Sequence, residues 1–300
     1  MSFFNIPIIQ FLLFGNFFVG ICAVGLSIET SYRQNLALNP IYYYLLVFSG
    51  TALYYTKAFL HKSSGYPDNE RDQWYSKNKK LTLFTQFFFI GILLICGILF
   101  FASNSNKISE LNSIQLFMLL LFPFVALLYY GINSKLNIRK YGQLKPFLIG
   151  FAWAGIVTIY PIIFQSLGDE SSFKLSQNRV LLFIENFIFI SVLCIMFDIK
   201  DFKEDSVFQL KTYAVSQGIK KTIYFIIIPL SVIGIITNIL FVILNHYPLI
   251  QALSINIPLL LGIYFSFKLL KHKRILYYLF FIDGLMLVKS LCGIAASQFN

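Results

Sequence analysis

Four acidic residues lie within the eight positions from 198 to 205, directly after an apolar run. Three of them, Asp198, Asp201 and Asp205, recur at positions i, i+3 and i+7. At about 100° per residue, this spacing places their carboxylates on one face of a helix. Such a face repels itself unless cations neutralise it, and carboxylate oxygens are preferred ligands of Mg²⁺. The spacing allows two interpretations: a magnesium site for a phosphate-bearing substrate, or a solvated and charged helix end.

A diphosphate bound to magnesium needs further positive groups around its remaining oxygens. Lys211 is the best candidate because it follows the acidic stretch closely. Lys145 and Lys57 are further candidates, because each lies near the end of an apolar run on the same predicted side of the membrane.

The composition identifies the class of protein that must position these groups. The 300 residues are 57% hydrophobic and 12% charged, whereas soluble domains contain about 25% charged residues. Repeated apolar runs near 20 residues predict an all-α, polytopic membrane protein. The net charge of +11 does not indicate nucleic-acid binding, because the basic residues lie between the apolar runs and not in one basic domain.

The apolar runs predict nine transmembrane helices in a single domain spanning residues 1–300. Each run is near the length that crosses about 30 Å of hydrocarbon, and no Pro/Gly/Ser-rich linker divides the chain. Four of them contain an internal proline that predicts a kink. The prolines are Pro123, Pro161, Pro229 and Pro258, and the runs are 8–28, 39–60, 81–102, 112–132, 144–165, 179–198, 221–244, 247–269 and 275–296.

Loop charges predict the orientation. With nine helices, 19 of the 24 basic residues fall in loops on one side, and Arg33 is among the few on the other. The positive-inside rule then places the N-terminus and the acidic stretch on the cytoplasmic side and the C-terminus outside.

The stretch Phe197-Asp198-Ile199-Lys200-Asp201-Phe202-Lys203-Glu204-Asp205, followed by Lys211-Thr212 and Gly218, resembles the second Asp-rich motif of the UbiA-type intramembrane prenyltransferases. That motif reads D-[IV]-x-D-x-x-x-D, with a K-T pair and a glycine before the next helix. The stretch 144–153 resembles the start of the family's fifth helix, and Tyr277-Tyr278 with Asp283-Gly284 resembles the last helix of bacterial members.

The resemblance implies a helical bundle with a central cavity that opens toward the cytoplasm and laterally to membrane lipid. Members transfer an isoprenyl chain from a prenyl diphosphate to an acceptor that is often aromatic or otherwise lipophilic. Mg²⁺ promotes departure of pyrophosphate. On this basis Asp198, Asp201 and Asp205 are the expected catalytic residues and magnesium ligands, and Lys211 is the expected phosphate contact.

The family's first motif, N-D-x-x-D-x-x-x-D, has no counterpart at the end of the second apolar run. Residues 54–62 contain no carboxylate there but do contain Lys57 and His61. We hypothesise that one of these two replaces a cation by neutralising phosphate directly. Asp68 and Asp72 have the spacing D-x-x-x-D just beyond, and they are either a displaced first motif or part of a solvated loop.

Ionisable residues within the apolar runs are functional candidates by default. Asp283 is expected either to reach the cavity and contact substrate or to bond a neighbouring helix. Lys289 lies six positions later and is not expected to pair with it. Glu185 lies six residues after Arg179, and a structural ion pair is expected for it.

Two other functions remain open from the sequence. One is a non-catalytic, lipid-binding membrane protein with the UbiA fold. The other is an ion-coupled transporter that uses Asp198, Asp201 and Asp283. The lack of a detectable internal repeat in the sequence disfavours the transporter.

Overall fold

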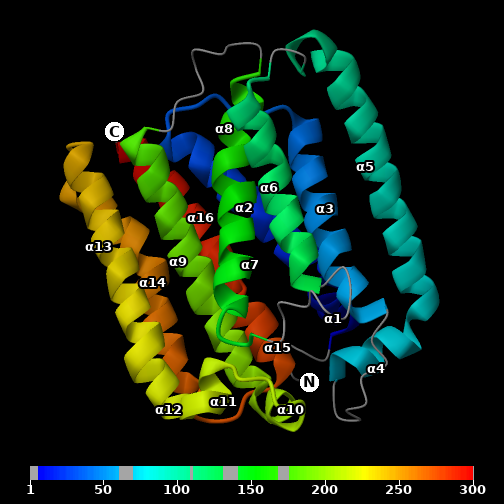
Figure 1. The fold of residues 1–300 in the computed structure, drawn as a ribbon, viewed down its shortest axis with the longest axis vertical. Helices are drawn as coiled ribbons and strands as arrows, with labels where there is room; N and C mark the ends of the chain where they lie inside the picture. The colour runs from blue at the N-terminus through cyan, green and yellow to red at the C-terminus, as the bar shows by residue number, and fades with distance from the viewer. Residues whose placement is uncertain (1–5, 61–69, 109–110, 131–140, 168–175, 300) are drawn as a thin grey trace.

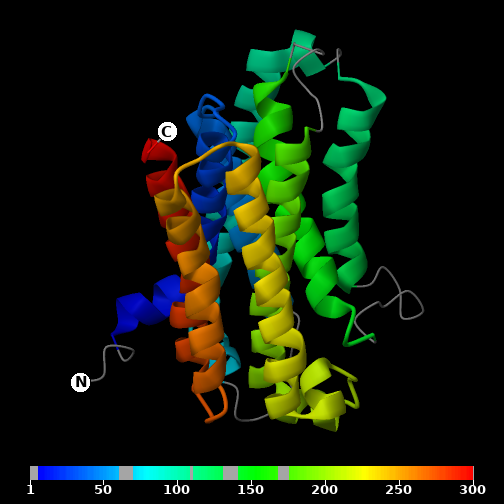
Figure 2. The same cartoon turned by 90° about the vertical axis from the view of Figure 1, so that its left-hand side faces the viewer.

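The computed structural model describes residues 6–60, 70–108, 111–130, 141–167 and 176–299. These ranges contain helices and no strand, which confirms the all-α prediction for the described residues. The long helices run alongside one another (Figure 1). The ends of the chain lie at opposite ends of the bundle (Figures 1 and 2).

Every predicted apolar segment falls on helix where the structure describes it. Some segments are one helix and others are two helices joined by a break or by a π-helical turn. The elements are α1 (Pro7–Phe14), α2 (Phe17–Arg33), α3 (Ile41–Leu60), α4 (Glu70–Lys77), α5 (Lys79–Ile108), α6 (Ser113–Tyr130), α7 (Lys145–Ala154), η3 (Gly155–Ile159), α8 (Tyr160–Gln165), α9 (Gln177–Lys200), α10 (Phe202–Val207), α11 (Tyr213–Gln217), α12 (Ile219–Thr222), η4 (Ile223–Ile227), α13 (Ile228–Leu244), α14 (Leu249–Lys268), α15 (Ile275–Tyr277), η5 (Tyr278–Ile282), α16 (Gly284–Ala296) and η6 (Ser297–Phe299).

Six helical rods in the described residues are long and apolar enough to cross a membrane, and the bent pair α1–α2 makes a seventh. The chain is therefore a multi-pass membrane protein. Helix α6 is apolar but shorter, and α3 is rich in tyrosine. The count of nine transmembrane helices stays a prediction.

Two of the four internal prolines coincide with π-helical turns. Pro161 follows η3 and Pro229 follows η4. Proline lacks the N–H that would bond the carbonyl four residues earlier, and its ring clashes with that carbonyl. The helix widens at that point in both rods, as π-bulges do. Pro123 and Pro258 lie within α6 and α14 without such a turn.

The first apolar segment is not one straight helix. It bends by 58° between α1 and α2, where Asn16 has a left-handed backbone with φ of 63°. Arg71 of α4 stabilises the bend by donating to Asn16 Oδ1 at 2.5 Å and to the Phe14 carbonyl at 3.3 Å. Tyr75 donates to the same carbonyl at 2.6 Å. Part of the second predicted loop therefore binds the first helix.

At the other end of this segment the predicted loop position of Arg33 was wrong, and the ion pair expected for Glu185 is present but with other partners than Arg179. Helix α2 continues to Arg33, which is buried and not part of an outer loop. Glu185 pairs with Arg33 and Lys289. A buried charge needs a close partner of opposite sign, and the bundle supplies it from distant parts of the chain.

Helix α9 is the centre of the packing. It contacts α7 and α13, while α2 packs against α16 and α3, and α14 packs against α16 and α13. Helix α5 packs mainly on α3 at one edge (Figure 1). Its outer face is apolar and exposed, as expected for a surface that contacts lipid. The most exposed side chains on this face are Phe84, Phe87, Leu94, Ile95, Ile98 and Phe101.

Candidate functional site

The acidic stretch lies at the end of α9, where the chain turns into α10 and α11 (Figure 1). Asp198 belongs to the last turn of α9, which ends at Lys200. Asp201 lies between α9 and α10, with φ of −84° and ψ of 5°, and Asp205 lies in α10. The prediction of one continuous helical face is therefore wrong, because the helix is interrupted at the middle aspartate.

Asp198 forms a buried ion pair with Lys145. The Lys145 Nζ lies 2.8 Å from Asp198 Oδ1, and the side chain of Asp198 is fully buried whereas that of Lys145 is 17% exposed. The other oxygen, Asp198 Oδ2, has no hydrogen-bond partner among the described residues. Asp198 therefore keeps one acceptor available inside the bundle.

The packing of α7 on α9 brings Lys145 to this position. Lys145 is the first residue of α7, and Pro146 next to it suits the first turn of a helix. At Gly150, a Cβ would lie 2.8 Å from the Phe187 carbonyl and 2.3 Å from Ser191 Oγ on α9. Only glycine permits so close an approach of the two helices.

Asp205 is a second buried carboxylate at the same end of the bundle. Its Oδ2 has no hydrogen-bond partner among the described residues. Burial raises the pKa of Asp205 to about 7. The nearby acids Asp201, Asp198 and Glu204 raise this pKa further, whereas the ammonium of Lys145 lowers it. Lys145 therefore acts electrostatically on Asp205 as well as on Asp198.

Asp201 differs from its two neighbours. It is partly exposed and its carboxylate contacts the ammonium of Lys200, the adjacent residue. Of the three predicted ligands, Asp198 and Asp205 each have a buried oxygen without a hydrogen-bond partner among the described residues, whereas Asp201 is partly exposed.

Lys211, the predicted phosphate contact, lies in the loop after α10. It is exposed and lines a pocket of about 490 Å³ whose lining does not include the three aspartates. The backbone at 211–212 lies only 2.7 Å from where a Cβ of Gly142 would be, so the two loops touch. The rest of the lining is Tyr141, Gly142, Gln143, Leu144, Phe147 and Tyr213. Lys145, not Lys211, is the lysine that contacts Asp198.

The other predicted contacts are spread over the bundle. Lys57 is exposed on α3. His61 and Asp68 lie outside the described residues. Asp283 lies at the junction of η5 and α16. It interacts electrostatically with Arg71 and with Tyr55, whose hydroxyl accepts a hydrogen bond from Trp153 at 2.8 Å.

The α4 segment provides another ion pair at this end of the molecule. Arg274, just before α15, bonds Glu70 through two nitrogens at 2.9 and 3.2 Å. This contact raises the pKa of Arg274. Glu70 therefore binds a neighbouring element, and Asp72 lies in the first turn of α4. Sequence spacing did not predict either placement.

The donor set fits a cation only in part. Among the described residues, no group of three or more His, Cys, Asp or Glu side chains is arranged to hold a metal ion. Asp198 and Asp205 nevertheless offer two unpaired, buried carboxylate oxygens. In proteins, Mg²⁺ is usually bound by one or two carboxylates together with substrate phosphates and water. The number of unpaired carboxylates, two, therefore matches what a magnesium ion that arrives with a phosphate-bearing ligand needs from the protein.

No protein-family model matches the chain, and no curated protein sequence matches it. A solved structure of digeranylgeranylglyceryl phosphate synthase in membranes has a similar fold, with a TM-score of 0.54. The similarity covers 96% of this chain and 97% of that chain, with 18% sequence identity. That protein is a UbiA-type intramembrane prenyltransferase. The resemblance predicted from residues 197–218 is thus confirmed at the level of the fold.

Proposed function

We propose that this protein transfers an isoprenyl chain from a prenyl diphosphate to a lipophilic acceptor. The buried pair of Lys145 and Asp198, with its unpaired oxygen, carries the proposal. A buried carboxylate without a full set of partners is unfavourable unless a ligand completes it. The fold similarity to a prenyltransferase supports the same substrate class.

In the proposed reaction, the bond between C1 of the prenyl chain and the diphosphate oxygen breaks, and the electron pair leaves with pyrophosphate. The acceptor atom forms the new bond to C1 and then loses a proton. Lys145 would contact the diphosphate because it is the cation closest to the buried carboxylates. Asp198 and Asp205 would hold Mg²⁺, which when bound supplies positive charge opposite the departing pyrophosphate.

The remaining predicted features belong to the same proposal. The Asp198 end of the bundle is the cytoplasmic end, and nine helices span the membrane. Lys211 would contact phosphate from the neighbouring loop pocket, since it is the one lysine in that lining. Lys57, His61 and Asp283 are proposed contacts for the substrates.

The direct test is turnover by the purified full chain in lipid nanodiscs. Prenyl diphosphates of different length would be supplied with a panel of aromatic and lipid alcohol acceptors, and pyrophosphate release and prenylated product would be measured together. We expect stoichiometric amounts of both with Mg²⁺ and a loss of at least 100-fold with EDTA. Absence of product over the whole panel, in protein that binds none of the prenyl diphosphates, would refute the proposal.

A non-catalytic isoprenoid-binding protein is the second candidate. It is favoured by the sequence at the end of α3, where Lys57 stands in a stretch without the carboxylates of a first Asp-rich motif. In the same assay this function would give binding of a prenyl lipid that does not depend on Mg²⁺, with no pyrophosphate released.

Asp205 predicts how binding depends on pH. Its pKa of about 7 means that the carboxylate is mostly neutral at pH 6 and mostly ionised at pH 8. Only the ionised form attracts a cation, so the affinity for a prenyl diphosphate in the presence of Mg²⁺ should rise about tenfold over this range. Titration calorimetry at several pH values would measure it.

The variant Asp205→Asn serves as the control because the diphosphate also titrates. It should remove most of the rise in affinity with pH and leave the contribution of the ligand itself. If the affinity of Asp205→Asn for the prenyl diphosphate rose with pH as steeply as that of the wild type, this role for Asp205 would be excluded.

The stability of the fold should also depend on Asp205. The native state binds the proton of the Asp205 carboxyl more tightly than the unfolded chain, where the ordinary pKa is 3.8. The contribution of Asp205 to the free energy of unfolding should therefore fall as the pH rises from about 4 to about 7.

A further inference from the structure

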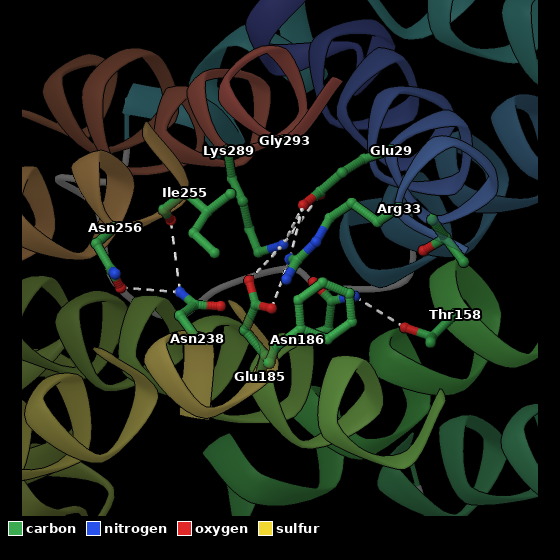
Figure 3. A network of polar contacts seen from close by, with 12 residues as sticks. Glu29, Arg33, Thr158, Glu185, Asn186, Asn238, Ile255, Asn256, Lys289 and Gly293 are labelled. Atoms are coloured by element: carbon green, nitrogen blue, oxygen red, sulfur yellow. Dashed lines mark hydrogen bonds and ion pairs between the residues drawn. The ribbon is translucent and has the colours of Figure 1, made fainter. Parts of the chain in front are cut away.

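A second group of charges lies inside the bundle, between helices from distant parts of the chain (Figure 3). It consists of Glu29 and Arg33 of α2, Glu185 of α9 and Lys289 of α16, and we call it the charge cluster. Glu185 precedes Asp198 by 13 positions, or about 20 Å along a helix. All four residues are between 1% and 5% exposed. They are thus removed both from water and from the candidate site.

The charges in this cluster are fully balanced and connected. The Lys289 Nζ lies 2.8 Å from Glu29 Oε1 and 3.0 Å from Glu185 Oε1. The Arg33 Nη1 lies 2.5 Å from Glu185 Oε2 and 3.3 Å from Glu29 Oε1. Each carboxylate therefore contacts both cations. Two acids and two bases sum to zero, which is the arrangement that makes buried charge tolerable in hydrocarbon.

The surrounding side chains fit this arrangement. A Cβ at Gly293 of α16 would lie 2.5 Å from Glu29 Oε1, so glycine makes room for the carboxylate. The Arg33 guanidinium lies over the ring of Phe241, 4.4 Å from its centroid. Asn238 of α13 lies against Glu185. When the Asn238 amide is oriented with its nitrogen toward Glu185, that nitrogen lies 3.0 Å from Glu185 Oε1 and 2.6 Å from Oε2.

Three helices far apart in sequence are connected through these contacts. Glu29 and Lys289 are 260 positions apart, and Arg33 and Glu185 are 152 apart. Sliding one of these helices by a single turn, about 5.4 Å, would separate the ion pairs that this helix makes with the other two. Apolar side chains tolerate such shifts more easily, because dispersion contacts are not directional. The cluster thus specifies one axial register of α2, α9 and α16.

We infer that the charge cluster is an interhelical clasp that positions α16 against α2 and α9. Its residues are positioning residues and not catalytic ones. Two of the clasped helices carry candidate site residues, Asp198 on α9 and Asp283 next to α16. The importance of the clasp for catalysis rests on the proposed function, whereas its effect on helix register does not.

The test is a double-mutant cycle on charge balance. Lys289→Met leaves one uncompensated negative charge, and Glu29→Gln leaves one uncompensated positive charge. Each should lower the Tm in detergent by about 10 °C. The double variant restores neutrality through Arg33 and Glu185, and should recover at least half of the summed loss. The matched control, Lys220→Met at an exposed lysine, should shift the Tm by less than 2 °C.

Cysteine labelling separates a register change from general destabilisation. Cys22 of α2 is fully buried and donates to the Asp283 carbonyl at 3.7 Å, so it reports directly on the contact of α2 with α16. In each single variant, N-ethylmaleimide should label Cys22 at least tenfold faster, and the double variant should restore slow labelling. Cys96 of α5 lies outside the clasped helices and should change by less than twofold.

Two results would overturn the clasp. One is strict additivity of the two losses in Tm, and the other is equal acceleration of labelling at Cys22 and Cys96 in the single variants. Neither measurement requires turnover, so failure of the clasp and failure of the proposed function are distinguishable. If prenyl transfer is found, the single variants should lower kcat more than they change the affinity for the diphosphate.

Discussion

Replacing Asp198 by asparagine is expected to lower the rate of prenyl transfer about 100-fold while the bundle stays folded. Asparagine has the same shape but no charge, so both the partner of Lys145 and the proposed cation ligand are lost. Removing one preorganised charged contact to a reacting phosphate typically costs two to three orders of magnitude. Pyrophosphate release in single-turnover conditions would measure the chemical step.

Stability should change much less than activity in this variant. The residue left without its partner is Lys145, whose side chain is 17% exposed and can turn its ammonium toward water or lipid phosphate. Asp201→Asn is the matched control, because Asp201 is partly exposed and contacts Lys200, and it should cost less than tenfold in rate. Retention of more than a third of the wild-type rate in Asp198→Asn would remove Asp198 from the proposed chemistry.

The helical segments could be predicted because hydropathy is a local property. Each apolar run falls on helix in the described residues, and Asp198 lies at the helix end that the run 179–198 indicates. Prolines inside the runs indicate where a helix can deviate, and at Pro161 and Pro229 a π-helical turn precedes the proline. These features depend on residues within one or two turns of each other.

The break of the helix at Asp201 could not be predicted in this way. No proline or glycine interrupts residues 198–205, and the periodicity of the aspartates is helical throughout. The chain turns there into α10, which contacts both α9 and α11, and no local sequence signal marks the turn. Propensity is a weak guide where packing decides.

The partners of the buried charges also could not be predicted from spacing in the sequence. Glu185 was expected to pair with Arg179, six positions earlier, but it pairs with Arg33 and Lys289. Long-range pairing depends on which helices are neighbours, and hydropathy and spacing along a single sequence do not report that. The one available signal was the presence of Glu185 and Lys289 within apolar runs, where an ionisable group requires a partner.

For Lys211 and Lys145 too, distance along the sequence did not predict which lysine contacts Asp198. Lys211 is close to the aspartates in sequence, yet it lines a separate pocket. Lys145 is 53 positions from Asp198 and forms the ion pair. The close approach of α7 and α9 at Gly150 explains the difference. The structure therefore makes Lys145 the more informative residue to change.

Lys145→Met is expected to destabilise the fold and abolish binding of the diphosphate together. Methionine keeps the length of the side chain but leaves the carboxylate of Asp198 fully buried and without a cation. Breaking one side of a buried ion pair typically costs 3–5 kcal/mol. We expect a loss of about 3 kcal/mol, seen as a fall in Tm of roughly 8 °C in detergent. Titration with a prenyl diphosphate would measure the loss of affinity.

Combining the two substitutions separates stability from function. In Asp198→Asn with Lys145→Met, position 198 no longer carries a buried charge that needs a cation, so most of the lost Tm should return. Binding of the diphosphate and turnover should both stay absent, because neither the cation nor the carboxylate is present. A double variant no more stable than Lys145→Met would show that the pair does not couple energetically. If Lys145→Met still bound the prenyl diphosphate with wild-type affinity, another cation would have to hold the phosphate, and Lys211 would become the first to test.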